Sequence, residues 1–170
     1  MFANGKIVAY PTDTSYGLGV RADDEEMLDR LYEIKKRPVT KFTSLMVKDW
    51  QMLNEYAEVP EILTEKFFTA SPRTVILKPK ESLPKSPFWP DHAVGFRIAT
   101  RPAVASAINY PVTATSANLS GQSNIYDPSK IVGEWGSEIL IFSESPVLDD
   151  SISPSEIWDY TVPNKPKRIR

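Results

Sequence analysis

The strongest constraint on the fold of this chain is the segment from Ile7 to Gly19, which reads IVAYPTDTSYGLG. It begins with an apolar run, and the proline at position 11 ends the expected strand because proline supplies no donor to a β-ladder. Four polar residues and then two glycines follow. The segment therefore predicts a buried strand that leads into a loop of small residues. Ligands of open α/β sheets bind beyond the carboxyl ends of strands, although such a loop can also satisfy only its own backbone.

A second segment of the same design covers residues 111–121 and reads PVTATSANLSG. An expected strand again leads into small polar residues, here Thr115, Ser116 and Asn118. Two loops of this kind in one chain favour a ligand site over two turns whose hydroxyl groups bond only their own backbone.

A helix is predicted over Asp23–Arg37. Asp23 and Glu26 form an Asp-x-x-Glu start that resembles a capping box. Apolar residues then recur at helical spacing. Pro38 ends the helix, since the residue before a proline avoids the α region.

The last turn of this predicted helix holds Lys35, Lys36 and Arg37. Cations at the carboxyl end of a helix stabilise it through the macrodipole, and that alone could explain them. Lys41 and Lys48 follow closely, however, so positive charge gathers around one loop. If Lys35 and Arg37 bind phosphate instead, we expect both to be exposed in the empty protein.

The remaining pattern predicts alternating strands and helices. Strands are expected at 44–47, 74–77, 94–98, 112–114, 139–142 and 155–160. Helices are expected at 49–57, 60–67 and 102–109 and from Asp127-Pro128 onward. Residues 81–92 are rich in proline and predict a surface loop. Arg97 lies on the face of its strand opposite Phe96 and Ile98. The fold class is α/β, in a single domain over 1–170.

Composition excludes several classes of protein. The chain has no cysteine and one histidine among 170 residues, which argues against disulfides, thiolate metal sites and a Ser-His triad. No apolar run is long enough to span a bilayer, and no signal peptide is visible, so a cytoplasmic protein is expected. A net charge of −2 favours no global attraction to nucleic acid.

Two hydroxyl loops, a cation cluster and a strand arginine are suitable parts for a phosphate site. The chain has neither a P-loop nor a Gly-x-Gly-x-x-Gly run. The residues by themselves therefore predict an α/β domain that binds a phosphorylated small molecule.

Four ordered motifs, YPTDTSYGLG, YEIKKRP, VGFRIATRP and TATSANLSG, resemble those of the YrdC/TsaC family of threonylcarbamoyl-adenylate synthases. The resemblance runs from about Gly5 to the end of the chain and includes the late segment PSEIWD. Lys35 and Arg37 match the Lys-x-Arg signature of the family, and Ser116 and Asn118 match its Ser-x-Asn signature.

This resemblance implies a twisted, mixed β-sheet flanked by helices, with an open, positively charged cavity. It also implies a nucleotidyltransferase that converts L-threonine, bicarbonate and ATP into threonylcarbamoyl-AMP and pyrophosphate, with Mg²⁺ expected alongside ATP and no metal site in the protein. Partner proteins of the family transfer the threonylcarbamoyl group to tRNA.

Site roles follow from the resemblance, residue by residue. Lys35 and Arg37 are the expected catalytic residues. The nucleotide is expected to contact both of them together with Ser116, Asn118 and Ser155. Threonine is expected to contact Thr12, Arg97 and Thr115.

The chain departs from the family pattern in three places. Only residues 1–6 precede the first strand, where the family usually has a helix, which is consistent with a shortened start. A Trp-Pro-Gly-Pro-like segment is reduced to residues 70–73, and Lys41-Phe42-Thr43 stands where Lys-Pro-Leu or Asn-Pro-Leu is common. The alternative function is a non-catalytic YciO-like paralogue that binds nucleotide or RNA, either tRNA or double-stranded RNA.

Overall fold

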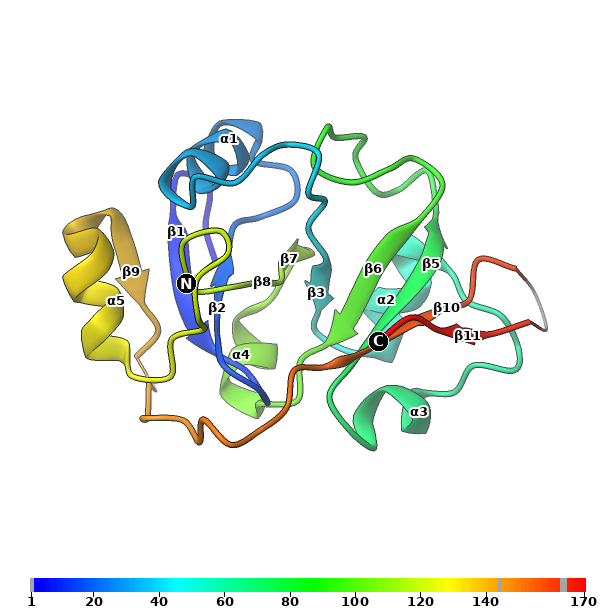
Figure 1. Ribbon diagram of the computed structural model, residues 1–170. Helices are drawn as coiled ribbons and strands as arrows, with labels where there is room; N and C mark the ends of the chain where they lie inside the picture. Colours follow the sequence, from blue (N-terminus) through cyan, green and yellow to red (C-terminus); the bar gives the residue numbers. More distant parts are fainter. Residues whose placement is uncertain (1, 144, 163–164) are drawn as a thin grey trace.

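The computed structural model describes residues 2–143, 145–162 and 165–170 and contains two twisted β-sheets with helices around them (Figure 1). The smaller sheet has four strands in the order β8-β2-β1-β9. The larger sheet has seven strands, six of them in the order β11-β10-β5-β6-β3-β7, with β4 beside β5. The predicted α/β class is confirmed, but the strands divide between two sheets where one was expected.

The strands of the smaller sheet are β1 (Ile7–Pro11), β2 (Tyr16–Gly19), β8 (Thr115–Ser116) and β9 (Ile139–Ile141). Those of the larger sheet are β3 (Leu45–Val47), β4 (Ala57–Glu58), β5 (Arg73–Pro79), β6 (Val94–Ile98), β7 (Val112–Thr113), β10 (Glu156–Asp159) and β11 (Lys167–Arg168). The helices are α1 (Glu25–Ile34), α2 (Trp50–Tyr56), α3 (Glu65–Thr69), α4 (Pro102–Ala107), α5 (Pro128–Trp135) and the 3₁₀ turn η1 (Gly136–Glu138).

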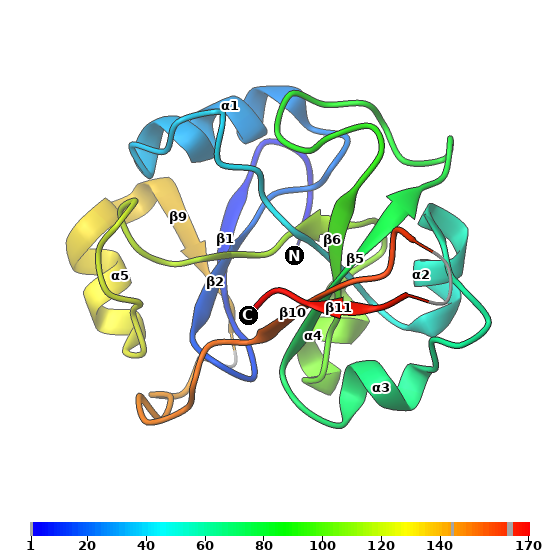
Figure 2. The same cartoon turned by 45° about the vertical axis from the view of Figure 1, so that its right-hand side comes forward.

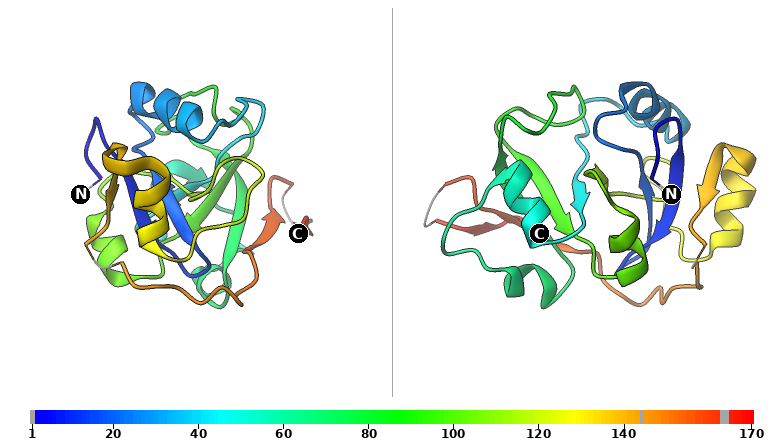
Figure 3. Two further views of the ribbon diagram at one scale, coloured as in Figure 1. Left: turned by 60° about the vertical axis from the view of Figure 1, so that its left-hand side comes forward. Right: turned by 180° about the vertical axis from the view of Figure 1, so that it is seen from behind.

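Pairing is mixed in both sheets, because β1–β9, β3–β6 and β5–β10 are parallel while the other pairs are antiparallel. Helix α5 packs beside β9 at one end of the molecule, and α2 and α3 contact the larger sheet at the other (Figures 1 and 3). In the described part of the chain, none of the helices is both long and apolar enough to cross a bilayer.

The chain crosses between the sheets at two places that matter for the site. At Ala114 it passes from β7 in the larger sheet to β8 in the smaller one. The Thr113 hydroxyl donates to the Leu18 carbonyl at 2.9 Å and accepts from the Val20 amide at 3.0 Å, so it fixes this crossing. The second crossing is the segment 145–155, which runs along one edge of the molecule from β9 towards β10 (Figure 2).

Two predicted helices have different bounds in the structure. The helix expected over Asp23–Arg37 begins at Glu25, because the Asp24 side chain accepts the Met27 amide at 3.2 Å, and it ends at Ile34. The helix expected from Pro60 is only α3, which begins after Thr64. Residues 60–63 instead form a turn, closed by the Leu63 amide on the Pro60 carbonyl at 2.9 Å.

The buried hydrophobic side chains of both sheets form one cluster. Its packing requires two aromatic rings to lie close to the backbone of Gly19. A Cβ atom at this position would lie 2.6 Å from the Phe2 ring and 2.9 Å from the fully buried ring of Tyr10. We therefore predict that Gly19→Ala lowers the free energy of unfolding by about 1–3 kcal/mol, as overpacking does.

Gly133 provides the matched control, because it lies inside α5 and a Cβ atom added there would have no neighbour within 4 Å. Gly133→Ala should raise the free energy of unfolding by about 0.5–1 kcal/mol, since alanine loses less backbone entropy in a helix. Urea denaturation measures both changes. Equal effects of the two substitutions would contradict the packing argument.

Candidate functional site

A cavity of about 380 Å³ lies between the two sheets. The smaller sheet contributes β2, β8 and the 12–15 loop, and the larger sheet contributes side chains from β5, β6 and β10. Hydroxyl side chains and three arginines dominate its wall. Among the described residues that line the cavity, none has a carboxylate side chain. The wall is thus suited to an anionic ligand with many hydrogen-bonding groups.

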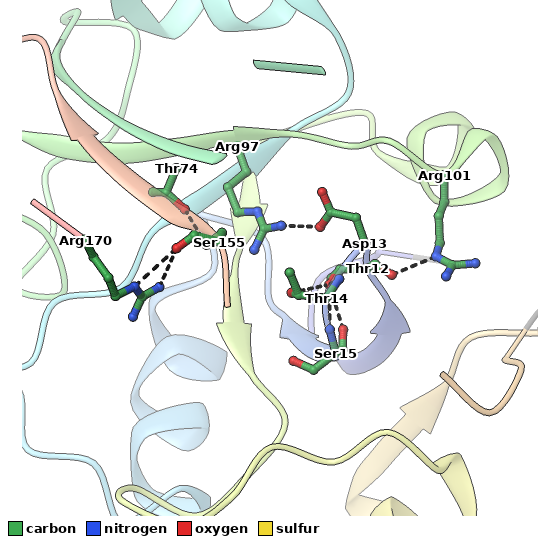
Figure 4. Close-up of polar contacts among 9 residues, drawn as sticks. All are labelled: Thr12, Asp13, Thr14, Ser15, Thr74, Arg97, Arg101, Ser155 and Arg170. Carbon is green, nitrogen blue, oxygen red and sulfur yellow. Dashed lines mark hydrogen bonds and ion pairs between the residues drawn. The ribbon is translucent and has the colours of Figure 1, made fainter. Parts of the chain in front are cut away.

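The 12–15 loop is closed by the side chain of Thr12 (Figure 4). Its hydroxyl donates to the Ser15 carbonyl at 2.7 Å and accepts the Thr14 amide at 3.1 Å and the Ser15 amide at 3.3 Å. Threonine can make this local turn because its hydroxyl both donates and accepts. The turn leaves Thr14 and Ser15 on the wall of the cavity.

Two arginines from the side of the larger sheet reach this loop (Figure 4). Arg97, on β6, forms an ion pair with the carboxylate of Asp13. Arg101 donates from Nε to the Thr12 carbonyl at 2.8 Å. The loop is therefore held both by its own turn and by contacts across the gap between the sheets.

Ser155 lies opposite this loop, immediately before β10. Its hydroxyl is 3.3 Å from that of Thr74, and its carbonyl accepts Nε and Nη2 of Arg170 at 3.2 and 2.9 Å (Figure 4). Ser155 is buried among these partners, so its position is set by contacts with β5 and with residues near β11.

The predicted placement of the three cations in the last turn of α1 is wrong. Lys35 is the C-cap, and Lys36 adopts the left-handed region with φ 48°. The Arg37 amide donates to the Tyr32 carbonyl and the Lys36 amide to the Glu33 carbonyl, both at 2.9 Å. These two bonds are those of a Schellman motif, which turns the chain sharply after the helix.

Because of this turn, Arg37 points into the loop that leads to β3. Its Nε donates to the Lys41 carbonyl at 3.0 Å and its Nη2 to the Phe42 carbonyl at 2.8 Å. The guanidinium also lies over the ring of Tyr32, 5.6 Å from the ring centre. Arg37 lines the cavity with its planar group already oriented.

Lys35 is buried, with 1% of its surface exposed, which contradicts the expectation of an exposed cation. Its ammonium donates to the carbonyls of Ser116 and Asn118, the latter at 2.7 Å. Burial, with Arg37 nearby, lowers the pKa of Lys35 to about 7. The side chain is therefore engaged with the second hydroxyl loop and is not on the cavity wall.

Six of the eight residues predicted for the site line this cavity: Thr12, Arg37, Arg97, Thr115, Ser116 and Ser155. Lys35 and Asn118 do not. The Asn118 side chain accepts from the Ser116 hydroxyl at 2.6 Å and donates to the Gln122 carbonyl at 2.6 Å. Lys35 and Asn118 therefore both support the loop behind the wall.

Sequence reasoning missed several residues of the wall. Thr14 and Ser15 belong to the first motif and were detectable there. Thr43 was named only as part of a departure from the family pattern. Thr74 and Arg170 carried no local signal, since they come together at the cavity through the pairing of β10 with β5 and with β11. In the described residues, no three His, Cys, Asp or Glu side chains gather closely enough to hold a metal ion.

Known proteins are similar to this chain in sequence and in fold. Threonylcarbamoyl-AMP synthase of Vibrio vulnificus is 32% identical over 165 residues, which cover 91% of this chain and 87% of the relative. The synthase of the same name from Pseudoalteromonas translucida is 28% identical over 165 residues, covering 92% and 88%.

Among solved structures, P. abyssi Sua5 complexed with L-threonine superposes with a TM-score of 0.81 at 27% identity, over 98% of this chain and 50% of that one. The chain thus spans about half of that protein. E. coli YciO has the same fold, with a TM-score of 0.80 at 24% identity over 98% of this chain and 82% of that one. The family described as "Telomere recombination" (Sua5, YciO, YrdC) matches residues 1–170, and the chain belongs to this Sua5/YciO/YrdC family.

Proposed function

We propose that the protein is a threonylcarbamoyl-AMP synthase, a nucleotidyltransferase that uses L-threonine, bicarbonate and ATP. The relatives from Vibrio vulnificus and Pseudoalteromonas translucida carry this name and align over most of the chain. The observation that carries the proposal is the cavity between the sheets, whose wall combines arginines with hydroxyl groups from residues 12–15 and 115–116. Such a wall suits a reaction that needs anion positioning more than a proton-transferring side chain.

We assign the binding of the L-threonine substrate to one part of the wall, formed by Thr12, Arg97 and Thr115. The P. abyssi Sua5 structure was solved with L-threonine, which supports an amino-acid subsite in this fold. Arg97 is suited to a carboxylate because it already pairs with one, that of Asp13. A substrate carboxylate would share or replace this partner, and the planar guanidinium can bind it through two parallel hydrogen bonds.

We assign the nucleotide to Arg37, Ser116 and Ser155 on the wall, with Asn118 and Lys35 in supporting positions behind them. Arg37 would contact the phosphates directly from the wall. Lys35 would serve the nucleotide through the loop that it holds, because its ammonium is bonded to the carbonyls of Ser116 and Asn118.

The chemistry follows from these assignments. The threonine amine and bicarbonate form a carbamate with loss of water. A carbamate oxygen then attacks the α-phosphorus of ATP, and the bond to the β-phosphate oxygen breaks so that pyrophosphate leaves. Charge develops on the phosphate oxygens, where preoriented guanidinium groups stabilise it most.

Mg²⁺ is assigned to the substrate and not to a site in the protein. This ion commonly binds through substrate phosphates with few protein ligands, which fits a wall whose described residues include no carboxylate side chain. The product would pass to partner proteins that modify tRNA in the cytoplasm. Binding of tRNA by this chain itself is part of this proposal.

The decisive experiment is to incubate the protein with ATP, Mg²⁺, bicarbonate and L-threonine and to follow pyrophosphate and threonylcarbamoyl-AMP. The synthase proposal requires release that depends on both threonine and bicarbonate. Nucleotide binding without any product would contradict it and favour the YciO-like alternative. Binding of bare tRNA with a steep salt dependence would indicate an RNA-binding module.

Arg37→Lys separates charge from geometry at the phosphate site. The lysine keeps the positive charge but loses the planar group that now bonds two carbonyls. We predict a folded protein that still binds ATP weakly in calorimetry and releases pyrophosphate about a hundredfold more slowly, the usual loss when one electrostatic partner of a transition state is removed. A melting temperature that falls by several degrees while turnover stays intact would assign Arg37 to structure alone.

Lys35→Met tests the buried ammonium through the pH dependence of stability. The folded-state pKa of Lys35 is about 7, whereas its ordinary pKa is 10.5. Between these values the unfolded chain binds more protons than the folded protein does, so the free energy of unfolding should rise with pH. We predict that this rise, measured by urea denaturation at three pH values between the two pKa values, is steeper in the parent than in Lys35→Met. Equal slopes would mean that Lys35 stays charged in the folded protein.

A further inference from the structure

Hydrogen bonds within the 12–15 loop fix its conformation, whereas contacts with other parts of the chain fix its position. The loop connects the end of β1 at Pro11 to the start of β2 at Tyr16, both in the smaller sheet. The bonds of the Thr12 hydroxyl close the turn, but each of them stays within the loop. The distance of this loop from the opposite wall therefore depends on contacts that cross the gap between the sheets.

Two such contacts come from one short stretch of chain, Arg97 on β6 and Arg101 at the start of α4 (Figure 4). Arg97 pairs with the side chain of Asp13 and lines the cavity. Arg101 donates to the main-chain carbonyl of Thr12 at 2.8 Å and is not among the residues that line the cavity.

The two contacts differ in what substrate binding does to them. Under the proposed function, the carboxylate of threonine competes with Asp13 for Arg97, so this contact weakens when substrate enters. The bond from Arg101 ends on a carbonyl that no substrate replaces. Because the Thr12 hydroxyl accepts the amides of Thr14 and Ser15, holding the Thr12 backbone holds the whole turn.

We propose that Arg101 is a positioning residue, which holds the 12–15 loop at the spacing from Arg97 that the amino-acid substrate requires. The inference rests on the proposed function for the identity of that substrate. Its physical content is the bond between Arg101 Nε and the Thr12 carbonyl, which a long planar donor can make from the N-cap of α4. Misplacement of a substrate-positioning group by even a small distance is costly to binding and rate.

The first test uses Arg101→Met, which keeps most of the apolar stem and removes the donor. Amide hydrogen exchange of the 12–15 loop is measured in the protein without substrate. We expect exchange to be roughly tenfold faster in the variant, because a loop that loses an anchor opens more often. Exchange equal to that of the parent would overturn the proposal.

The matched control is Arg21→Met. Arg21 is also partly buried, and its guanidinium bonds Asp23 at 2.9 Å and Asn109 at 3.2 Å, away from the cavity wall. This substitution should leave exchange of the 12–15 loop unchanged. Equal acceleration in both variants would mean that any lost guanidinium loosens the loop, which also overturns the proposal.

The second test is kinetic and separates positioning from general stability. Arg101→Met should raise the KM for threonine roughly tenfold while kcat changes by less than about threefold and the KM for ATP stays the same, as expected when ground-state binding of one substrate is lost. The KM of Arg101→Lys for threonine should lie between those of the parent and Arg101→Met, since one donor group, the lysine ammonium, remains. Arg101→Lys is used for both tests if Arg101→Met does not fold. An unchanged threonine KM, or an equal rise for ATP, overturns the assignment.

Failure of the proposed function would look different. A parent protein that releases no pyrophosphate removes the synthase assignment, whereas the exchange measurement still decides whether Arg101 holds the loop.

Discussion

The hydrogen bonds of the buried Lys35 ammonium join the end of α1 to the loop after β8. A cation removed from water is costly unless its hydrogen-bonding capacity is met. Here the carbonyls of Ser116 and Asn118 accept from two of its three N–H donors. In addition, the Ser120 amide donates to the Lys35 carbonyl at 2.9 Å. These two parts of the site are therefore held together, and the turn that follows Lys35 directs Arg37 to the cavity.

The cavity exists because the strands divide between two sheets. A single continuous sheet would bring strand ends to one edge, whereas two sheets leave a space that both of them line. The crossing at Ala114 keeps the sheets close, since the Thr113 hydroxyl bonds both the Leu18 carbonyl and the Val20 amide. The segment 145–155 also crosses from the smaller sheet to the larger one, and it contributes Pro154 and Ser155 to the wall.

The three arginines of the wall are oriented before any ligand arrives. Arg37 bonds two carbonyls, Arg97 bonds a carboxylate and Arg170 bonds the Ser155 carbonyl. Each bond restricts a flexible side chain, so less entropy is lost when an anion binds. Such preorientation is the property that electrostatic stabilisation of a transition state requires.

A first strand beginning at Ile7, the strand at 94–98 and the polar turn at 12–15 could be predicted from the amino-acid sequence, and the family resemblance indicated six of the residues on the cavity wall. The prediction of loop was wrong for 16–19 and 115–116, which are strands β2 and β8, and β1 continues through Pro11. The strands and loops are local features, because strand alternation, proline breaks and hydroxyl turns depend on residues a few positions apart. The burial of Lys35, the division of the strands into two sheets and the recruitment of Thr74 and Arg170 to the site were decided by tertiary contacts alone. The Lys35 bonds reach residues 81 and 83 positions away, and no periodicity of the chain records a contact at that separation.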